Sequence, residues 1–252
     1  MPTFVQTPVR AVLRILRWVG RHELSTLVAI CLAASSIWAF AALADEVGEQ
    51  DTQQFDRQIL LSLRTPDDLS DPLGPKYVEE LGRDFTALGG VGVLVLVSVS
   101  VVVYLLLSGK PQTALLVASA VIGALVTSLL LKHGFSRPRP DLVPHESYVY
   151  TSSFPSGHAM SSAATYLSLG GLLARSHRRF RFKAFFLLLA LSLTICVGIS
   201  RVYLGVHWPT DVVAGWALGA FWATLVWLAA RWLQQRGHVE PEPSRRPGQP
   251  AA

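Results

Sequence analysis

The sequence predicts an all-α membrane protein, a polytopic bundle of six transmembrane helices with short extracytoplasmic surface helices. Hydrophobic residues make up 51% of the 252 positions and charged residues only 15%, where average soluble domains carry about a quarter. The mean hydropathy is +0.39. Long uncharged runs approach the length of about 20 residues that a helix needs to cross a bilayer. These features exclude a disordered chain, a collagen-like fibre and an ordinary cytosolic globule.

Six segments are predicted to cross the membrane. The first three contain no charged residue, and the fourth is interrupted only by His158. The fifth is short but continues through Arg201 to Val206. The predicted spans are residues 24–44, 85–109, 111–131, 154–174, 184–200 and 212–230.

The charges of the connecting loops predict the orientation. Basic residues cluster before the first span, between the fourth and fifth, and after the sixth, whereas residues 45–84 contain eleven acids and four bases. Because basic loops stay in the cytoplasm, we expect both termini inside and the 45–84 loop outside. The net charge of +5 therefore reflects membrane orientation rather than nucleic-acid binding. The compact layout favours a bacterial inner (plasma) membrane, with the 45–84 side periplasmic.

The chain divides into three parts. Residues 1–23 form a basic leader whose arginines recur at helical intervals, which predicts an amphipathic interfacial helix. Residues 24–236 form the six-span domain, and the polar tail, residues 237–252, is predicted to be disordered and cytoplasmic. Within the outer loop, helical spacing of apolar residues predicts two short surface helices separated by a break at residues 71–75.

Two smaller features of the sequence have simple interpretations. The first span could instead be a cleaved signal peptide, because residues 42–44 resemble a cleavage site, but its apolar run exceeds the usual length of about 7–15 residues. Cys31 and Cys196 lie in apolar runs and provide neither a disulfide framework nor the spacing of a zinc site.

Unusual polar residues gather at the outer ends of the last four spans. Each has an ordinary explanation, such as a snorkelling lysine, a serine N-cap or an aspartate at a helix dipole. Their common face favours a functional site instead, because ionisable groups at this depth are costly. The residues are Lys132 and Arg139 after the third span, Ser156, Gly157 and His158 opening the fourth, Arg201 in the fifth, and His207 and Asp211 opening the sixth.

These residue types suit phosphate chemistry. Lys132, Arg139 and Arg201 provide three cations for a phosphate, and the residues 156–158 begin a helix whose free N–H groups bind anions. A neutral imidazole attacks phosphorus if a carboxylate holds its other nitrogen, which predicts His207 as nucleophile and Asp211 as its partner. His158 is then predicted to protonate the leaving oxygen and later to help activate water.

At these positions the sequence resembles the type-2 phosphatidic acid phosphatase / vanadium haloperoxidase superfamily, specifically its membrane-bound branch of undecaprenyl-diphosphatase-like and phosphatidylglycerophosphatase-like lipid phosphatases. The family has a three-part signature, and all parts occur in order. Lys132, six residues and Arg139-Pro140 match the first, and residues 155–158, Pro-Ser-Gly-His, match the second. The third, Ser-Arg, five residues, His, three residues and Asp, covers residues 200–211.

The resemblance implies a role for each matched residue. Lys132, Arg139, Arg201, Ser156 and Gly157 would hold the phosphate. His207 would form a phosphohistidine, Asp211 would orient it, and His158 would be the general acid. The family uses neither a metal nor another cofactor. Arg137 lies outside the defining positions and receives no catalytic role.

The predicted function is therefore hydrolysis of a phosphate monoester or pyrophosphate of a membrane lipid. An outward-facing site suits carrier-lipid recycling, which favours undecaprenyl pyrophosphate, followed by phosphatidic acid, phosphatidylglycerol phosphate and a lipid A phosphate. The signature reads the phosphate and not the tail, so the natural lipid, the pathway and the oligomeric state stay open. Specificity is expected to depend on residues 141–154 and the outer loop.

Three other functions are compatible with parts of the pattern. A vanadate-dependent haloperoxidase has the same anion pocket, but its relatives are soluble. A non-enzymatic lipid transporter or scaffold is disfavoured because the spans have no charged residue at mid-depth. A metal-dependent hydrolase would use His133, Asp141, His145 and Glu146, and activity in excess EDTA would dismiss it.

Overall fold

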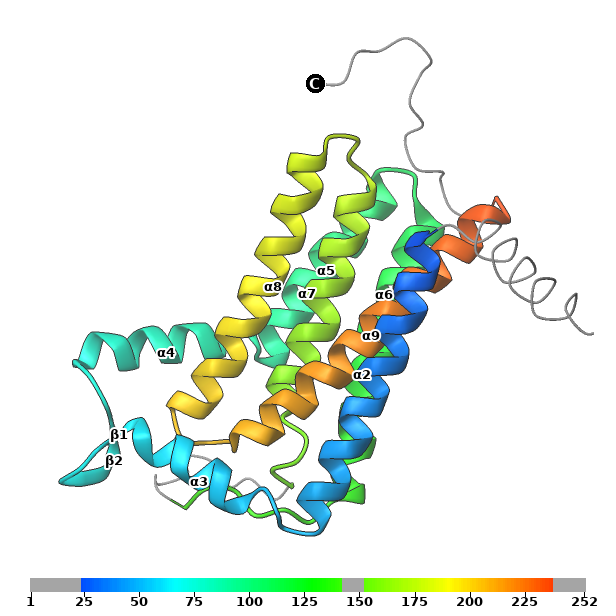
Figure 1. Ribbon diagram of the computed structural model, residues 1–252. Coiled ribbons are helices and arrows are strands. Elements are labelled where there is room, and N and C mark those ends of the chain that lie inside the picture. The colour runs from blue at the N-terminus through cyan, green and yellow to red at the C-terminus, as the bar shows by residue number, and fades with distance from the viewer. Residues whose placement is uncertain (1–23, 142–151, 238–252) are drawn as a thin grey trace, which may run out of the picture.

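The computed structural model describes residues 24–141 and 152–237, which form a bundle of long helices with a smaller layer of short elements at one end (Figure 1). The predicted leader helix and all but the first residue of the predicted tail lie outside the described residues. The long helices are α2 (Leu24–Gly48), α5 (Val91–Leu107), α6 (Pro111–Gly134), α7 (Gly157–Arg175), α8 (Phe180–Tyr203) and α9 (Pro209–Gln235).

Each predicted span corresponds to one of these helices, but the count of six spans is not confirmed. Four of them, α2, α6, α8 and α9, are long and apolar enough to cross a membrane. A fifth span results if α4 (Lys76–Leu88) and α5 are taken together as a pair bent by 50°. The structure therefore supports four or five membrane spans within the described residues.

Helix α7 is less apolar because it lies inside the bundle. Its neighbours are α5, α6, α8 and α9, and the side chains of Ser161, Ser162, Thr165 and Ser168 are buried among them. A helix covered by protein can carry such hydroxyl groups, since small polar residues allow close packing and find partners on other helices or on their own backbone. Ser162, for example, donates to the carbonyl of Ala159 at 3.2 Å.

Two glycines on α9 allow α7 and α9 to cross closely. A Cβ atom on Gly215 would lie 2.7 Å from the carbonyl oxygen of Ser156, and one on Gly219 would lie 2.4 Å from the Cβ of Ala163. Small residues at a crossing let backbones approach in this way. The crossing brings the first turns of both helices together, and the Ser156 N–H donates to the Asp211 carbonyl at 3.0 Å.

The outer layer contains the two predicted short helices, α3 (Gln53–Ser62) and α4, and a hairpin that was not predicted. Strands β1 (Arg64–Thr65) and β2 (Asp68–Pro72) pair antiparallel between the helices. Helix α4 lies across the direction of the bundle (Figure 1). The predicted span 85–109 is wrong at its start, because α4 ends at Leu88 with Gly89 as its C-cap, and α5 begins at Val91 with Gly90 as its N-cap.

An aromatic cluster packs α2 against the segment that precedes α7. The rings of Phe40 and Phe154 stack with centroids 5.8 Å apart, and Phe135 meets Phe154 edge-on at 4.8 Å. Large apolar side chains elsewhere point outward, with Leu107 of α5 84% exposed and Phe180 of α8 83% exposed. Such a surface suits a lipid environment, whereas the aromatic cluster fixes the outer end of the bundle.

Candidate functional site

The structure brings all eight predicted site residues to the outer end of the bundle. They come from four different helix ends and the connections between them. Lys132 lies in the last turn of α6, Arg139 in the following segment, Ser156, Gly157 and His158 at the start of α7, Arg201 in the last turn of α8, His207 before α9, and Asp211 in its first turn.

The turn between α8 and α9 places His207 beside Arg201. The backbone N–H groups of Val206 and His207 both donate to the carbonyl of Arg201, at 3.2 and 3.3 Å. Pro209 then begins α9, which suits its fixed φ and missing N–H, and His207 therefore precedes the helix. The imidazole of His207 is 1% exposed.

Asp211 is fully buried and accepts four hydrogen bonds. Its Oδ2 accepts from the Trp208 backbone N–H at 3.0 Å, from the Ser153 hydroxyl, and from His207 Nδ1 at 3.3 Å. Its Oδ1 accepts from Arg137 Nη1 at 2.6 Å. The predicted contact between His207 and Asp211 is thus present in the structure, and the carboxylate is held from several directions.

The surroundings of His207 define its tautomer. Its Nε2 lies 3.1 Å from Nη1 of Arg139, and a guanidinium group can only donate. Nε2 is therefore the unprotonated nitrogen, and Nδ1 carries the proton that points to Asp211. Burial lowers the pKa of His207 to about 4, although the hydrogen bond and charge of Asp211 oppose this shift. The neutral imidazole thus has a free electron pair on Nε2 at pH 7.

Arg139 contacts this nitrogen, Arg201 acts on the same ring through its charge, and Lys132 lies within electrostatic range of both arginines. Arg139 donates to the Val206 carbonyl at 3.0 Å, and Arg201 donates to the Thr86 hydroxyl at 3.0 Å. The Nε–H of each arginine is buried without a hydrogen-bond partner within the described residues. Burial lowers the pKa of Arg139. The unpaired donors and the concentrated positive charge suit an anion such as phosphate.

The start of α7 forms the opposite wall. The Ser156 hydroxyl caps the helix by accepting from the Ala159 N–H at 3.4 Å. A Cβ on Gly157 would lie 3.3 Å from Nζ of Lys132, so glycine leaves room for this ammonium group beside the helix end. His158 packs against Gly89, and its ring makes no hydrogen bond within the described residues. The helix start, a cation and a second imidazole are therefore adjacent.

Arg137, to which sequence analysis gave no role, lies in the centre of this end of the bundle. Its Nη1 contacts Asp211, and its Nη2 donates to Oδ2 of Asp56 at 2.5 Å. Asp56 belongs to α3 and is fully buried. Ser153, which donates to Asp211, was also missed.

A sequence signal for Asp56 did exist. Asp56 lies four residues before Leu60, so the two side chains share the apolar face of the predicted helix, and Leu60 is buried. A carboxylate on a buried face requires a partner. The partners, Arg137 and Thr210, lie more than 80 residues away in the chain, so no local pattern identifies them.

Within the described residues, no group of three or more His, Cys, Asp or Glu side chains is arranged to hold a metal ion. His145 and Glu146, two residues of the metal-hydrolase alternative, lie outside the described residues, as does most of the segment 141–154 that was expected to affect specificity.

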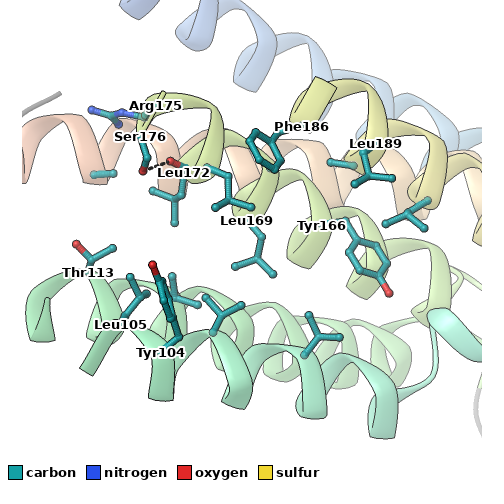
Figure 2. A pocket seen from close by; sticks show the side chains of 18 of the residues that line it. Tyr104, Leu105, Thr113, Tyr166, Leu169, Leu172, Arg175, Ser176, Phe186 and Leu189 are labelled. Atoms are coloured by element: carbon teal, nitrogen blue, oxygen red, sulfur yellow. Dashed lines mark hydrogen bonds between the residues drawn. The ribbon is translucent and has the colours of Figure 1, made fainter. Parts of the chain in front are cut away.

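An apolar cavity of about 590 Å³ lies between α5 and the pair α7 and α8 (Figure 2). Its lining is mostly aliphatic and includes Val97 and Val101 of α5 and Leu169 of α7. Near its outer end the Tyr166 hydroxyl donates to the Leu88 carbonyl at 2.7 Å. Leu88 lines the cavity and precedes Gly89, which His158 contacts, but none of the eight site residues lines it; the lining continues along the bundle as far as Arg175.

Comparison with known families supports one interpretation of this arrangement. The model of the PAP2 superfamily matches residues 113–235. The fold is similar to the crystal structure of a transmembrane PAP2 type phosphatidylglycerolphosphate phosphatase from Bacillus subtilis, with a TM-score of 0.67 and 27% sequence identity. That similarity covers 81% of this chain and 96% of the other.

Two relatives show the range of the sequence similarity. Phosphatidylglycerophosphatase B of Bacillus subtilis (strain 168) is 44% identical over 94 residues, which are 36% of this chain and 44% of the relative's length. The bacitracin transport permease protein BcrC of Bacillus licheniformis is 30% identical over 172 residues, which are 62% of this chain and 78% of the relative. The stronger identity is thus confined to less than half of the first relative.

Proposed function

This chain belongs to the PAP2 superfamily, and from that premise we propose that it is an integral-membrane lipid phosphatase acting through a phosphohistidine intermediate. One observation carries the proposal. A buried, neutral imidazole, His207, has Asp211 at its Nδ1 and Arg139 at its Nε2, and the charge of Arg201 also acts on the ring. This arrangement combines a nucleophile with a site for the charge of a phosphate, and the matched relatives named as phosphatases support it.

The proposed reaction has two steps. In the first, Nε2 of His207 attacks phosphorus while the bond to the leaving oxygen breaks, and His158 gives that oxygen a proton. For this attack the Arg139 N–H must move from Nε2 to a phosphate oxygen. In the second step a water molecule attacks phosphorus, its proton passes to His158, and the P–N bond breaks to release phosphate. Asp211 holds the Nδ1 proton throughout and stabilises the positive charge that develops on the ring.

Lys132, Arg139 and Arg201 serve as the phosphate-binding cations, together with the helix start at Ser156 and Gly157. The cations supply the charge that a metal supplies in other phosphatases, so the proposed reaction uses no cofactor. The N–H groups of Gly157 and His158, in the first turn of α7, have no partner inside the helix and are available to the same anion.

The cavity between α5, α7 and α8 supports a lipid substrate. It is apolar, its lining starts at Leu88, next to the Gly89 that His158 contacts, and it follows the helices as far as Arg175. We place the hydrocarbon chain of the substrate there, with the phosphate at the outer end.

The proposed topology has six spans, both termini in the cytoplasm and the site on the periplasmic side of a bacterial inner membrane. Helix α7 counts as a span because its polar residues face protein. An outward site favours undecaprenyl pyrophosphate as substrate, whereas the name of the solved PAP2 structure makes phosphatidylglycerol phosphate the next lipid to test, with phosphatidic acid.

The decisive experiment measures phosphate release in detergent and excess EDTA. Undecaprenyl pyrophosphate, phosphatidylglycerol phosphate, phosphatidic acid and a lipid A phosphate are offered to the wild type, to His207→Ala and to His133→Ala. We expect the wild type and His133→Ala to release phosphate and His207→Ala to release none. His133 is the matched control, because it is an exposed histidine at the same end of the bundle. Release by His207→Ala would refute the mechanism, and no release by the wild type from any lipid would refute the function.

A second experiment tests the chain-binding cavity. Val101→Trp fills the cavity, whereas Val103→Trp adds the same ring on the outward side of α5, where Val103 is 46% exposed. We expect Val101→Trp to lower kcat/KM for a long-chain lipid phosphate more than for its dioctanoyl analogue, and Val103→Trp to lower neither. An equal loss of kcat/KM on both substrates would show that the hydrocarbon chain of the substrate does not bind in this cavity.

A further inference from the structure

Asp56 and Arg137 form a buried pair that connects the outer helix α3 to the candidate catalytic carboxylate. Arg137 is 10% exposed and Asp56 is fully buried. One guanidinium nitrogen, Nη1, donates to Asp211 at 2.6 Å and to the Thr210 hydroxyl at 2.8 Å. The other, Nη2, donates to Asp56 at 2.5 Å and to the Thr52 hydroxyl at 3.1 Å. The guanidinium thus bridges two carboxylates.

The backbone at the start of α9 strengthens this connection. Asp56 accepts from the Thr210 N–H at 2.9 Å and from the Thr210 hydroxyl at 2.6 Å. The residue next to Thr210 is Asp211. Helix α3 therefore holds the first turn of α9 both through a direct bond to its backbone and through Arg137.

The charges of this group explain why two carboxylates flank one cation. When phosphorus binds to Nε2, the imidazole of His207 becomes positively charged and is stabilised by the negative charge of Asp211. A guanidinium paired with Asp211 alone would cancel that negative charge. Asp56 contributes a second negative charge to the same guanidinium, so the group of Asp56, Arg137 and Asp211 keeps a net charge of about −1.

We propose that Arg137 and Asp56 are positioning residues for the reaction: Arg137 fixes Oδ1 of Asp211 so that Oδ2 faces His207, and Asp56 offsets the charge of Arg137. This inference rests on the proposed function. Neither residue touches the phosphate, and both act through Asp211. The pair also makes helix α3, which lies outside the matched family region of residues 113–235, a part of the catalytic apparatus.

The other charged and titratable groups that face His207 and Asp211 are common to every variant considered below. They are Lys132 of α6, Arg139 of the segment after α6, His158 of α7 and Arg201 of α8. Because these groups stay unchanged, removing the charge of Asp56 or of Arg137 isolates the contribution of the pair.

The test compares Asp56→Asn, Arg137→Gln and the double variant by kcat, KM and the acidic limb of the pH profile. Loss of the Asp56 charge disfavours the imidazolium form of His207, so the acidic limb moves to lower pH. Loss of the Arg137 charge moves it to higher pH, and the double variant returns it toward the wild-type position. We expect kcat to fall about 100-fold in Arg137→Gln, because the carboxylate loses its position, while KM changes little.

Arg83→Gln is the matched control, since Arg83 forms an exposed ion pair with Glu79 on the outer helix α4. It is expected to keep the wild-type kcat and pH profile. Arg137→Lys keeps the charge but not the two-pronged contact, so it should lower kcat without moving the acidic limb. This variant and Asp56→Asn decide the question if Arg137→Gln does not fold, as judged by size-exclusion chromatography in detergent.

The failure of this inference is distinguishable from failure of the proposed function. If the wild type is active and His207→Ala inactive, but Asp56→Asn and the Arg137 variants keep wild-type kcat, the pair is not a positioning device. Acidic limbs that move in the same direction for Asp56→Asn and Arg137→Gln would also overturn it. An inactive wild type contradicts the proposed function itself.

Discussion

The two histidines of the candidate site stand in contrasting surroundings. His207, between α8 and α9, contacts Asp211 and Arg139 through its two ring nitrogens. Its backbone N–H donates to the backbone carbonyl of Arg201. His158, at the start of α7, packs against Gly89, and its ring has no hydrogen-bond partner within the described residues. One ring is fixed at every polar atom, whereas the other is held by packing alone.

This difference matches the tasks that the proposed reaction gives to each ring. A nucleophile has one target atom, and holding it in the attacking geometry removes an entropic cost from the reaction. The acid–base group must reach two atoms in turn, the leaving oxygen and then the attacking water. A ring without fixed partners can turn between them. Substitutions at either ring's surroundings therefore test this contrast.

The substitution Asp211→Asn should break the fixed side of the contrast. An amide in place of the carboxylate no longer holds the Nδ1 proton of His207, and we expect kcat to fall by about 10⁴-fold, as for other aspartates that orient a catalytic histidine. Phosphate release under saturating substrate measures the change. Asp71→Asn, at an exposed position of the hairpin, serves as the control. Activity within a few-fold of the wild type would show that Asp211 does not orient the nucleophile.

The substitution His158→Ala should remove the acid while leaving the nucleophile in place. General acid catalysis contributes about 10²–10⁴-fold, so kcat on a lipid phosphate should fall within that range. With a p-nitrophenyl phosphate ester, whose leaving group needs no proton, His158→Ala should regain much of the lost kcat. The same substrate should not restore the kcat of Asp211→Asn. Equal losses on both substrates would contradict the role of His158 as an acid.

The pH profile should report the fixed imidazole. Nε2 attacks only when unprotonated, and burial lowers the pKa of His207 to about 4. We therefore expect the acidic limb of the kcat/KM profile to lie near pH 4 and not near 6.5, the usual value for histidine. An acidic limb near pH 6.5 would show that the ring is solvated.

The same lowered pKa has a consequence for folding. The unfolded chain binds a proton at His207 below about pH 6.5, whereas the folded protein does so only below about pH 4. Stability from this group is thus complete above pH 6.5 and is lost as the pH falls toward 4. Thermal melts of the wild type and His207→Gln in this window measure it, and the variant should show the weaker pH dependence.

The substitution Gly215→Ala should have the smallest effect on activity. It acts indirectly, because it shifts the start of α7 relative to His207. The added Cβ would lie 2.7 Å from the Ser156 carbonyl, so the helices must separate. We expect a loss of about 1–3 kcal/mol in stability, as for other overpacked sites, with a modest rise in KM. Gly171→Ala is the control, because its Cβ would meet its nearest neighbour, Trp227, at 3.9 Å. Equal melting temperatures would show that the crossing is not tight.

The long helices and the signature residues were predictable because their signals are local. An uncharged run of about 20 residues indicates a membrane span regardless of which helices it packs against. Residues 156–158, Ser-Gly-His, indicate the start of a helix because serine is a common N-cap. The bend at Gly89–Gly90 was missed because the run around it is uniformly apolar, although two consecutive glycines are a recognised break. The short hairpin has too few residues to show an alternating pattern.

The partners of the site were harder to predict. Asp56 is one of eleven acids in the outer loop. Its place on the apolar face of α3 indicates burial, but only the folded structure identifies its partners, Arg137 and Thr210. Arg137 lies two residues before Arg139, and the spacing alone does not tell which guanidinium faces the phosphate and which faces Asp211. These assignments depend on chain segments that meet only after folding.

The buried Nε–H groups of Arg139 and Arg201 have no hydrogen-bond partner within the described residues, and they lie in a cluster of positive charges, so the site lowers the stability of the folded protein. A buried donor without a partner costs about 1–3 kcal/mol, and clustered like charges add to that cost. Selection for thermal stability alone, in the laboratory or by computational redesign, would therefore remove these arginines among the first substitutions. The variant with the highest thermal stability would therefore lack activity. A design that aims to stabilise the active protein must leave Arg139 and Arg201 unchanged.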